Sequence, residues 1–157
     1  TILLVAFAWR RRPDLRWSLF PVRLVVLTTV LFAVVTVLSQ LGLLDWLRPV
    51  AGEGEDWLAL LRLSAVAGVA SNAVNNLPAY LALEPVALDS TRRMLALLIG
   101  TNVGPLITIW GSLATILWRD RCRSADVEVS WQRFALLGAV AAPVLLVTTV
   151  SALAWVG

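Results

Sequence analysis

The sequence predicts an all-α polytopic membrane protein. Of its 157 residues, 59% are hydrophobic and only 15% are charged, and the mean hydropathy is +0.83. A soluble domain carries about a quarter charged residues, so this chain is too poor in charge to cover a water-facing surface. Long uncharged blocks supply the candidate spans. One of these blocks contains the polar stretch "TNVGPLITIWGSLA", residues 101–114, at a depth where lipid would surround it.

Composition also excludes several classes of protein. The chain has no histidine and a single cysteine, Cys122, so histidine metal sites, His-dependent catalytic triads and internal disulfides are excluded within it. We therefore expect no enzyme. The arginines behind the net charge of +3 lie beside apolar blocks, as topology signals do, and do not indicate a nucleic-acid partner.

The outer elements are predicted from length. Residues 1–9, "TILLVAFAW", are too few to span a bilayer and are interpreted as the end of a truncated helix. The 157 residues are therefore expected to be a C-terminal membrane-domain fragment. Uncharged or nearly uncharged blocks predict spans over residues 17–41 and 134–156.

Residues 57–89 are predicted to form a re-entrant hairpin. Their first apolar block, Leu58–Ala70, has 13 residues, which is too short to cross. Arginine-rich loops precede the first span and follow residue 118. Both loops lie on the cytoplasmic side only if residues 57–89 return to the side from which they enter.

The hairpin's sequence supports this topology. Ser64 and Gly68, like Ala67 and Ser71, are small residues four positions apart, a spacing that lets helices approach closely in lipid. The polar tip "SNAVNN" separates two apolar legs. Pro78 suits the first turn of a new helix, with Asn75 or Asn76 as its cap.

Residues 94–118 are predicted to form a broken span. Gly100, Gly104 and Pro105 disfavour a continuous helix through 100–105. Trp110 is also unusual, because the other tryptophans lie near the ends of apolar blocks, where an interfacial belt is expected.

The two polar stretches together predict a binding site. Irregular backbone at membrane depth must be buried in protein or line a cavity, and the exposed helix ends of broken spans hold solutes in secondary transporters. For a single residue, an alternative is that Ser or Thr bonds to its own helix, or that Asn joins two helices.

The segments "SNAVNNLPAYLAL", "LIGTNVGPLITIWGSLATILWRDR" and "VSWQRFALLGAVAAPVLL" resemble the C-terminal part of the arsenite permease (arsenical pump membrane protein) family of the ion transporter superfamily. The resemblance covers most of residues 17–156. It implies two inverted repeats, each with a re-entrant hairpin and a broken helix, of which this chain is the second. It places the substrate- or ion-binding residues at the two polar stretches: Ser71, Asn72, Asn75, Asn76, Thr101, Asn102, Gly104, Thr108, Gly111 and Ser112.

The chain departs from the family pattern at several of these positions. Family members commonly have Asp at the position of Asn102, Lys at that of Leu106 and Pro-Ile at Ile109-Trp110. The loss of an acid and a base puts proton coupling and arsenite itself in question, but not the superfamily.

We therefore expect a secondary active transporter of a small anion or metalloid oxyacid, with arsenite or antimonite efflux as the leading hypothesis. A sodium- or proton-coupled divalent anion or citrate-like carboxylate transporter is one alternative, and a passive channel or non-transporting membrane subunit is another. No cofactor or metal is expected, and H⁺ and Na⁺ are the candidate coupling ions. The expected partners are the substrate, the lipid bilayer of a bacterial inner membrane and the missing N-terminal repeat, with a homodimer and an ATPase subunit left open.

Overall fold

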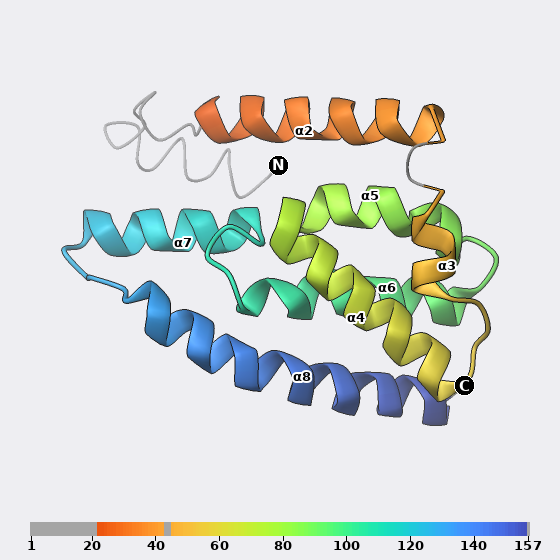
Figure 1. The fold of residues 1–157 in the computed structure, drawn as a ribbon. Helices are drawn as coiled ribbons and strands as arrows, with labels where there is room; N and C mark the ends of the chain where they lie inside the picture. Colours follow the sequence, from red (N-terminus) through yellow and green to blue (C-terminus); the bar gives the residue numbers. More distant parts are fainter. Residues whose placement is uncertain (1–21, 43–44, 157) are drawn as a thin grey trace, which may run out of the picture. The chain divides into compact units, whose positions relative to one another are not determined.

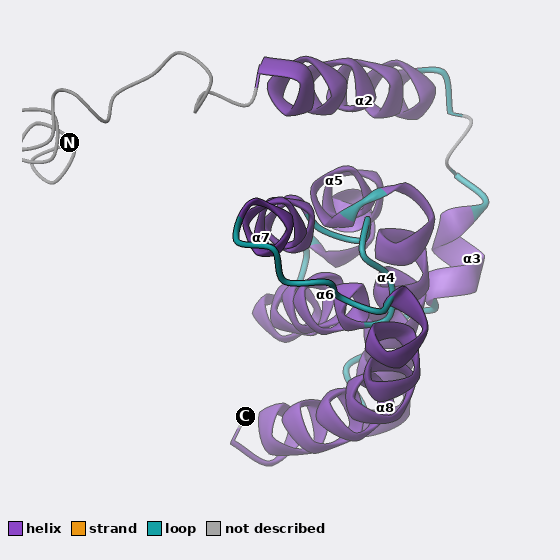
Figure 2. Cartoon of the chain, turned by 90° about the vertical axis from the view of Figure 1, so that its left-hand side faces the viewer, coloured by secondary structure: helices purple, strands orange, loops and turns teal. Residues whose placement is uncertain are grey.

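The computed structural model describes residues 22–42 and 45–156, apart from the side chains of Arg23 and Leu24. All regular structure in this part is helical, as Figures 1 and 2 show, which confirms the predicted all-α class. The expected helix end at 1–9 and the start of the predicted 17–41 span lie outside the described residues. The elements are α2 (Val22–Gln40), α3 (Leu47–Ala51), α4 (Trp57–Val74), α5 (Asn76–Ala87), α6 (Thr91–Val103), the 3₁₀ turn η3 (Gly104–Leu106), α7 (Leu113–Ser124) and α8 (Trp131–Val156).

The chain divides into two compact units, residues 1–30 and 31–157, so α2 contributes to both. The second unit contains both polar stretches. Its core is made of small and branched aliphatic side chains from α3, α4, α5, α6 and α8, including Leu60, Leu63, Leu83, Leu97 and Val150.

Helices α4 and α5 form a helical hairpin with its tip at Asn75. Asp56 caps the start of α4, because its carboxylate accepts the backbone N–H groups of Leu58 and Ala59. Pro78 lies in the first turn of α5, as predicted. Asn75 holds the predicted N-cap position of α5, but its side chain makes no capping bond: the amide nitrogen donates to the Trp110 carbonyl and the oxygen has no partner among the described residues.

A buried arginine joins the two ends of this hairpin. The Arg93 side chain is only 6% exposed and donates to the carbonyls of Gly52, Gly54 and Val86. Gly52 and Gly54 precede α4, and Val86 lies near the end of α5. The entry and exit of the hairpin are therefore held together at one end, opposite the tip.

Helix α4 packs on α6 at backbone distance, which confirms the role predicted for its small residues. A Cβ added at Gly104 would collide with the Cα of Gly68, and one at Gly100 would collide with the carbonyl oxygen of Ser64. The Ser64 hydroxyl also donates to the carbonyl of Ala96 at 2.7 Å. Figure 1 shows α4 crossing α6 with α8 lying beside them.

One prediction about helix length needs correction. Helix α4 has 18 residues and is long and apolar enough to cross a membrane, as is the 26-residue α8. The length of the 13-residue apolar block underestimates the length of α4, because the helix continues through the polar residues Ser71 and Asn72. Both apolar helices are identified by length and composition alone.

Helix α6 ends inside the 100–105 stretch where a break was predicted, but after Gly100 rather than at it. Helix α6 continues through Gly100 to Val103, Gly104 to Leu106 form η3, and residues 107–112 are not helical. Gly100 stays helical because its missing side chain makes room for α4.

The contact between α4 and α6 yields a matched pair of substitutions. Gly104→Ala is expected to destabilise the protein by about 1–3 kcal/mol, because the methyl group would overlap the α4 backbone. Gly68→Ala is expected to be neutral or stabilising, because a methyl group there would have its nearest neighbours at 3.4 Å or more and alanine favours the helix. Thermal unfolding of the full-length protein in detergent measures both. Equal midpoints for the two variants would contradict the packing described.

Candidate functional site

The tip of the hairpin is hydrogen-bonded to the connection between α6 and α7. Thr108 Oγ1 donates to Asn72 Oδ1 at 2.7 Å, and the indole N–H of Trp110 donates to the Asn72 carbonyl at 2.7 Å. The Asn75 amide donates to the Trp110 carbonyl at 2.9 Å, and the backbone N–H of Asn76 donates to the Gly111 carbonyl at 2.9 Å. We call residues 72–76 and 104–111 the junction. The two polar stretches singled out in the sequence thus meet there.

Asn72 is the most fully bonded side chain of the junction. Its amide nitrogen donates to the carbonyls of Gly68 and Gly104, at 2.8 and 2.7 Å, while its oxygen accepts from Thr108. Both amide protons are therefore used within the fold. Asn72 joins α4 to η3, as expected of an asparagine that holds helices together in lipid.

Asn75 is different in two respects. Its backbone has φ 88° and ψ 151°, a conformation found almost only in glycine. Its side chain is 8% exposed, and the oxygen Oδ1 is buried without a hydrogen-bond partner among the described residues. An unsatisfied buried acceptor costs about 1–3 kcal/mol, and the strained backbone costs a similar amount. Both costs fall on a single residue.

Three predicted site residues bond to their own helices instead. Ser71 donates to the carbonyl of Ala67, and Thr101 to those of Leu97 and Leu98. Ser112 caps α7 by accepting the backbone N–H of Thr115. These contacts match the alternative considered for single Ser and Thr residues.

The remaining predicted residues lie around this network. Gly104 and Gly111 contribute the carbonyls already described, and a Cβ at Gly111 would lie 2.9 Å from Thr108 Oγ1. Asn102 lies outside the network: its side chain is on the exposed face of α6 and donates to the carbonyl of Leu98.

Trp110 contributes hydrogen bonds to the junction but was not among the binding residues predicted from the sequence. Its position in the middle of an apolar block was the available signal, but a sequence does not show which partner a mid-membrane indole N–H will find. The structure shows that partner to be a carbonyl of the hairpin tip.

An apolar groove of about 450 Å³ adjoins the junction. It is lined by residues of α4, η3 and α8, and Asn72 is the only polar side chain among the described residues that line it. Gly68 and Gly104 form part of its floor. The groove gives the junction one apolar wall.

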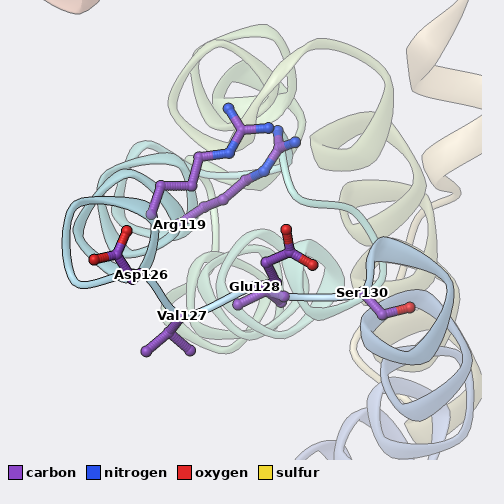
Figure 3. Close-up of a pocket in the computed structure, with 7 residues that line it drawn as sticks. Arg119, Asp126, Val127, Glu128 and Ser130 are labelled. Carbon is purple, nitrogen blue, oxygen red and sulfur yellow. The ribbon is translucent and has the colours of Figure 1, made fainter.

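A larger hollow of about 680 Å³ lies elsewhere, at the end of α7 and the loop that follows. Figure 3 shows Arg119, Asp126, Glu128 and Ser130 around it. It is lined by charges of both signs and contains no predicted site residue. We therefore assign the candidate site to the junction. Among the described residues, no group of three His, Cys, Asp or Glu could hold a metal ion.

Comparisons with known proteins agree on one family. The family model described as arsenical pump membrane protein matches residues 17–156. An arsenical pump membrane protein of Escherichia coli is 29% identical over 145 residues, which cover 85% of this chain and 34% of that protein. Those of Escherichia coli strain K12 and Shigella flexneri are 28% identical with the same coverage. The chain thus spans about a third of the length of these relatives. No solved structure matches.

The bond between Thr108 and Asn72 can be tested against a back-bonded threonine. Thr108→Val leaves the Asn72 oxygen without a partner and is expected to destabilise the full-length protein by about 1–3 kcal/mol. Thr101→Val removes only the hydroxyl bond to carbonyls of its own helix, α6. The free energy of unfolding is therefore expected to change by no more than about 0.5 kcal/mol. Thermal unfolding in detergent compares them. A larger loss for Thr101→Val would contradict the assignment of roles.

Proposed function

The chain belongs to the arsenical pump membrane protein family, and from that premise we propose that it is the second inverted repeat of a secondary active transporter. The transporter exports arsenite or antimonite across a bacterial inner membrane. The site lies at the junction and is completed by the first repeat, outside this chain. This assignment of the site rests on Asn75, which combines a strained backbone with a buried side-chain oxygen that has no hydrogen-bond partner among the described residues.

The base of the hairpin supports re-entry. Because Arg93 ties the segment before α4 to the end of α5, both ends of the hairpin lie together and its tip lies at the opposite end. A segment that enters and leaves at one point returns to the same side of a membrane. We propose that residues 57–89 enter and leave the membrane on the same side. We also propose that residues 104–112 interrupt the 94–118 span at the depth of the hairpin tip.

Asn75 supports a ligand at the tip. Glycine would adopt the same backbone without strain and would remove the unpaired side-chain oxygen, although it would also lose the bond to the Trp110 carbonyl. A sequence selected for stability alone would place glycine there. Retention of asparagine at a cost of a few kcal/mol is typical of a functional position.

The free atom also bears on the kind of ligand. Asn75 Oδ1 is an acceptor, so it pairs with a ligand that donates a hydrogen bond or carries positive charge. Arsenous acid is neutral and presents hydroxyl donors. The carboxylate groups of a divalent anion present only acceptors. The junction therefore favours a neutral metalloid hydroxide over a divalent carboxylate that lacks a hydroxyl group.

The packing refines the moving part. Because α4 contacts α6 backbone to backbone, the hairpin is expected to move together with α6 and η3 rather than slide along them. Alternating access would then displace this unit relative to the remainder of the transporter.

The test is expression of the full-length protein in an arsenite-sensitive host. We expect raised arsenite tolerance and arsenite uptake into everted vesicles. Asn75→Gly is expected to lower uptake at least tenfold while the midpoint of thermal unfolding stays close to that of wild type, because the relief of backbone strain offsets the lost hydrogen bond to the Trp110 carbonyl.

The outcomes separate the alternatives. Full uptake by Asn75→Gly would contradict the site. Uptake of a carboxylate but not arsenite would support the citrate-like alternative, and flux that persists without any ion gradient would indicate a channel. Ionophores that collapse the H⁺ or the Na⁺ gradient identify the coupling ion. Uptake without an ATPase subunit shows whether such a partner is needed.

A further inference from the structure

Trp110 makes two contacts with the hairpin tip from a loop that is not helical. Its indole N–H donates to the Asn72 carbonyl at 2.7 Å, and its own carbonyl accepts the Asn75 amide at 2.9 Å. Its side chain is nevertheless 58% exposed. Trp110 therefore bonds two of the three asparagines of the tip, Asn72 and Asn75, while more than half of its surface stays exposed.

The end of α4 explains why this contact matters. The last carbonyls of a helix have no partner within it. The Asn72 carbonyl would normally accept the N–H of Asn76, but that group donates to Gly111 instead. The Trp110 indole replaces the missing donor. In a low-dielectric setting, an unpaired carbonyl would be costly, so the indole stabilises the end of α4 in this position.

Trp57, a second tryptophan whose indole is hydrogen-bonded in the described part of the chain, provides a contrast. Trp57 also donates a hydrogen bond, to Ser151 Oγ at 2.9 Å, and is 44% exposed. That bond joins the start of α4 to α8, at the end of α4 opposite the tip. Trp57 and Trp110 are thus similar in chemistry and exposure but differ in what they hold.

We propose that Trp110 is a positioning residue that clasps the hairpin tip to the α6–α7 connection and fixes the direction in which Asn75 presents its free oxygen. This inference rests on the proposed function and adds a specificity-determining residue to its site. The clasp consists of the indole bond to Asn72 and the carbonyl bond from Asn75. Opening the tip requires both bonds to break.

The experiment compares Trp110→Phe with Trp57→Phe in the full-length protein. Both variants keep an aromatic ring and lose one indole N–H. For Trp110→Phe, we expect the KM for arsenite uptake into everted vesicles to rise about 5- to 10-fold with Vmax within about twofold, because a misplaced Asn75 weakens binding. For Trp57→Phe, we expect both constants to stay unchanged.

A second readout reports on the tip without transport. Ala73 is exposed at the tip and is replaced by cysteine in a background that carries Cys122→Ser and no other reactive cysteine. Alkylation by a water-soluble maleimide is expected to be severalfold faster in Trp110→Phe than in wild type or Trp57→Phe. Trp110→Tyr also lacks the indole N–H and replaces the phenylalanine variant if that variant folds poorly.

The two readouts distinguish the two hypotheses. If wild type does not transport arsenite but alkylation still rises in Trp110→Phe, the clasp stands and the proposed function fails. Unchanged alkylation in both Trp110 variants would overturn the clasp. So would a loss of Vmax with KM unchanged, since that pattern indicates a structural role alone.

Discussion

Backbone contact between α4 and α6 sets the position of every polar group at the junction. There is no room for a side chain at Gly100 or Gly104, because a Cβ at either position would overlap α4. Close packing at these two glycines therefore sets the register of the two segments. Interhelical attraction in lipid depends on such close van der Waals packing, because the hydrophobic effect does not distinguish a neighbouring helix from lipid tails. Asn72 lies one turn beyond Gly68 on α4, and this register alone brings its amide to the Gly104 carbonyl.

From this register follows the way the irregular backbone is satisfied. Residues 107–112 have no helical ladder, and at membrane depth each free N–H or C=O would be expensive. The hairpin tip has the complementary shortage, since α4 ends at Val74 and leaves its last carbonyls unpaired. Each segment supplies groups that the other lacks: the Gly111 carbonyl accepts from Asn76, and the Trp110 indole donates to Asn72. Each interruption therefore satisfies part of the backbone of the other.

The sequence was sufficient for features that depend on spacing and composition. The all-helical class, the small residues of α4 and the early Pro78 in α5 follow from local rules. It was insufficient where a residue's role depends on a partner distant in the chain. Gly100 looked like a helix breaker but is a contact surface, and Asn75 looked like a cap but donates across the junction. Ser71 and Thr101 looked like ligands, yet their hydroxyls bond within their own helices, which no sequence pattern distinguishes from an outward-facing hydroxyl.

The distribution of satisfied and unsatisfied groups then limits what the junction can recognise. The side-chain donors of Asn72, Thr108 and Trp110 are all bonded within the fold. These residues therefore hold the junction together, and their donors are not available to a ligand. A ligand that only accepts hydrogen bonds would find no free side-chain donor on these three residues, because each of those donors already bonds within the fold. Asn75 Oδ1 is the acceptor left over, on a strained backbone that the bond to Trp110 holds in place. Under the proposed function, the neighbours of this oxygen are bonded to one another, and Asn75 Oδ1 is the side-chain acceptor that would distinguish a hydroxyl donor from a ligand without one.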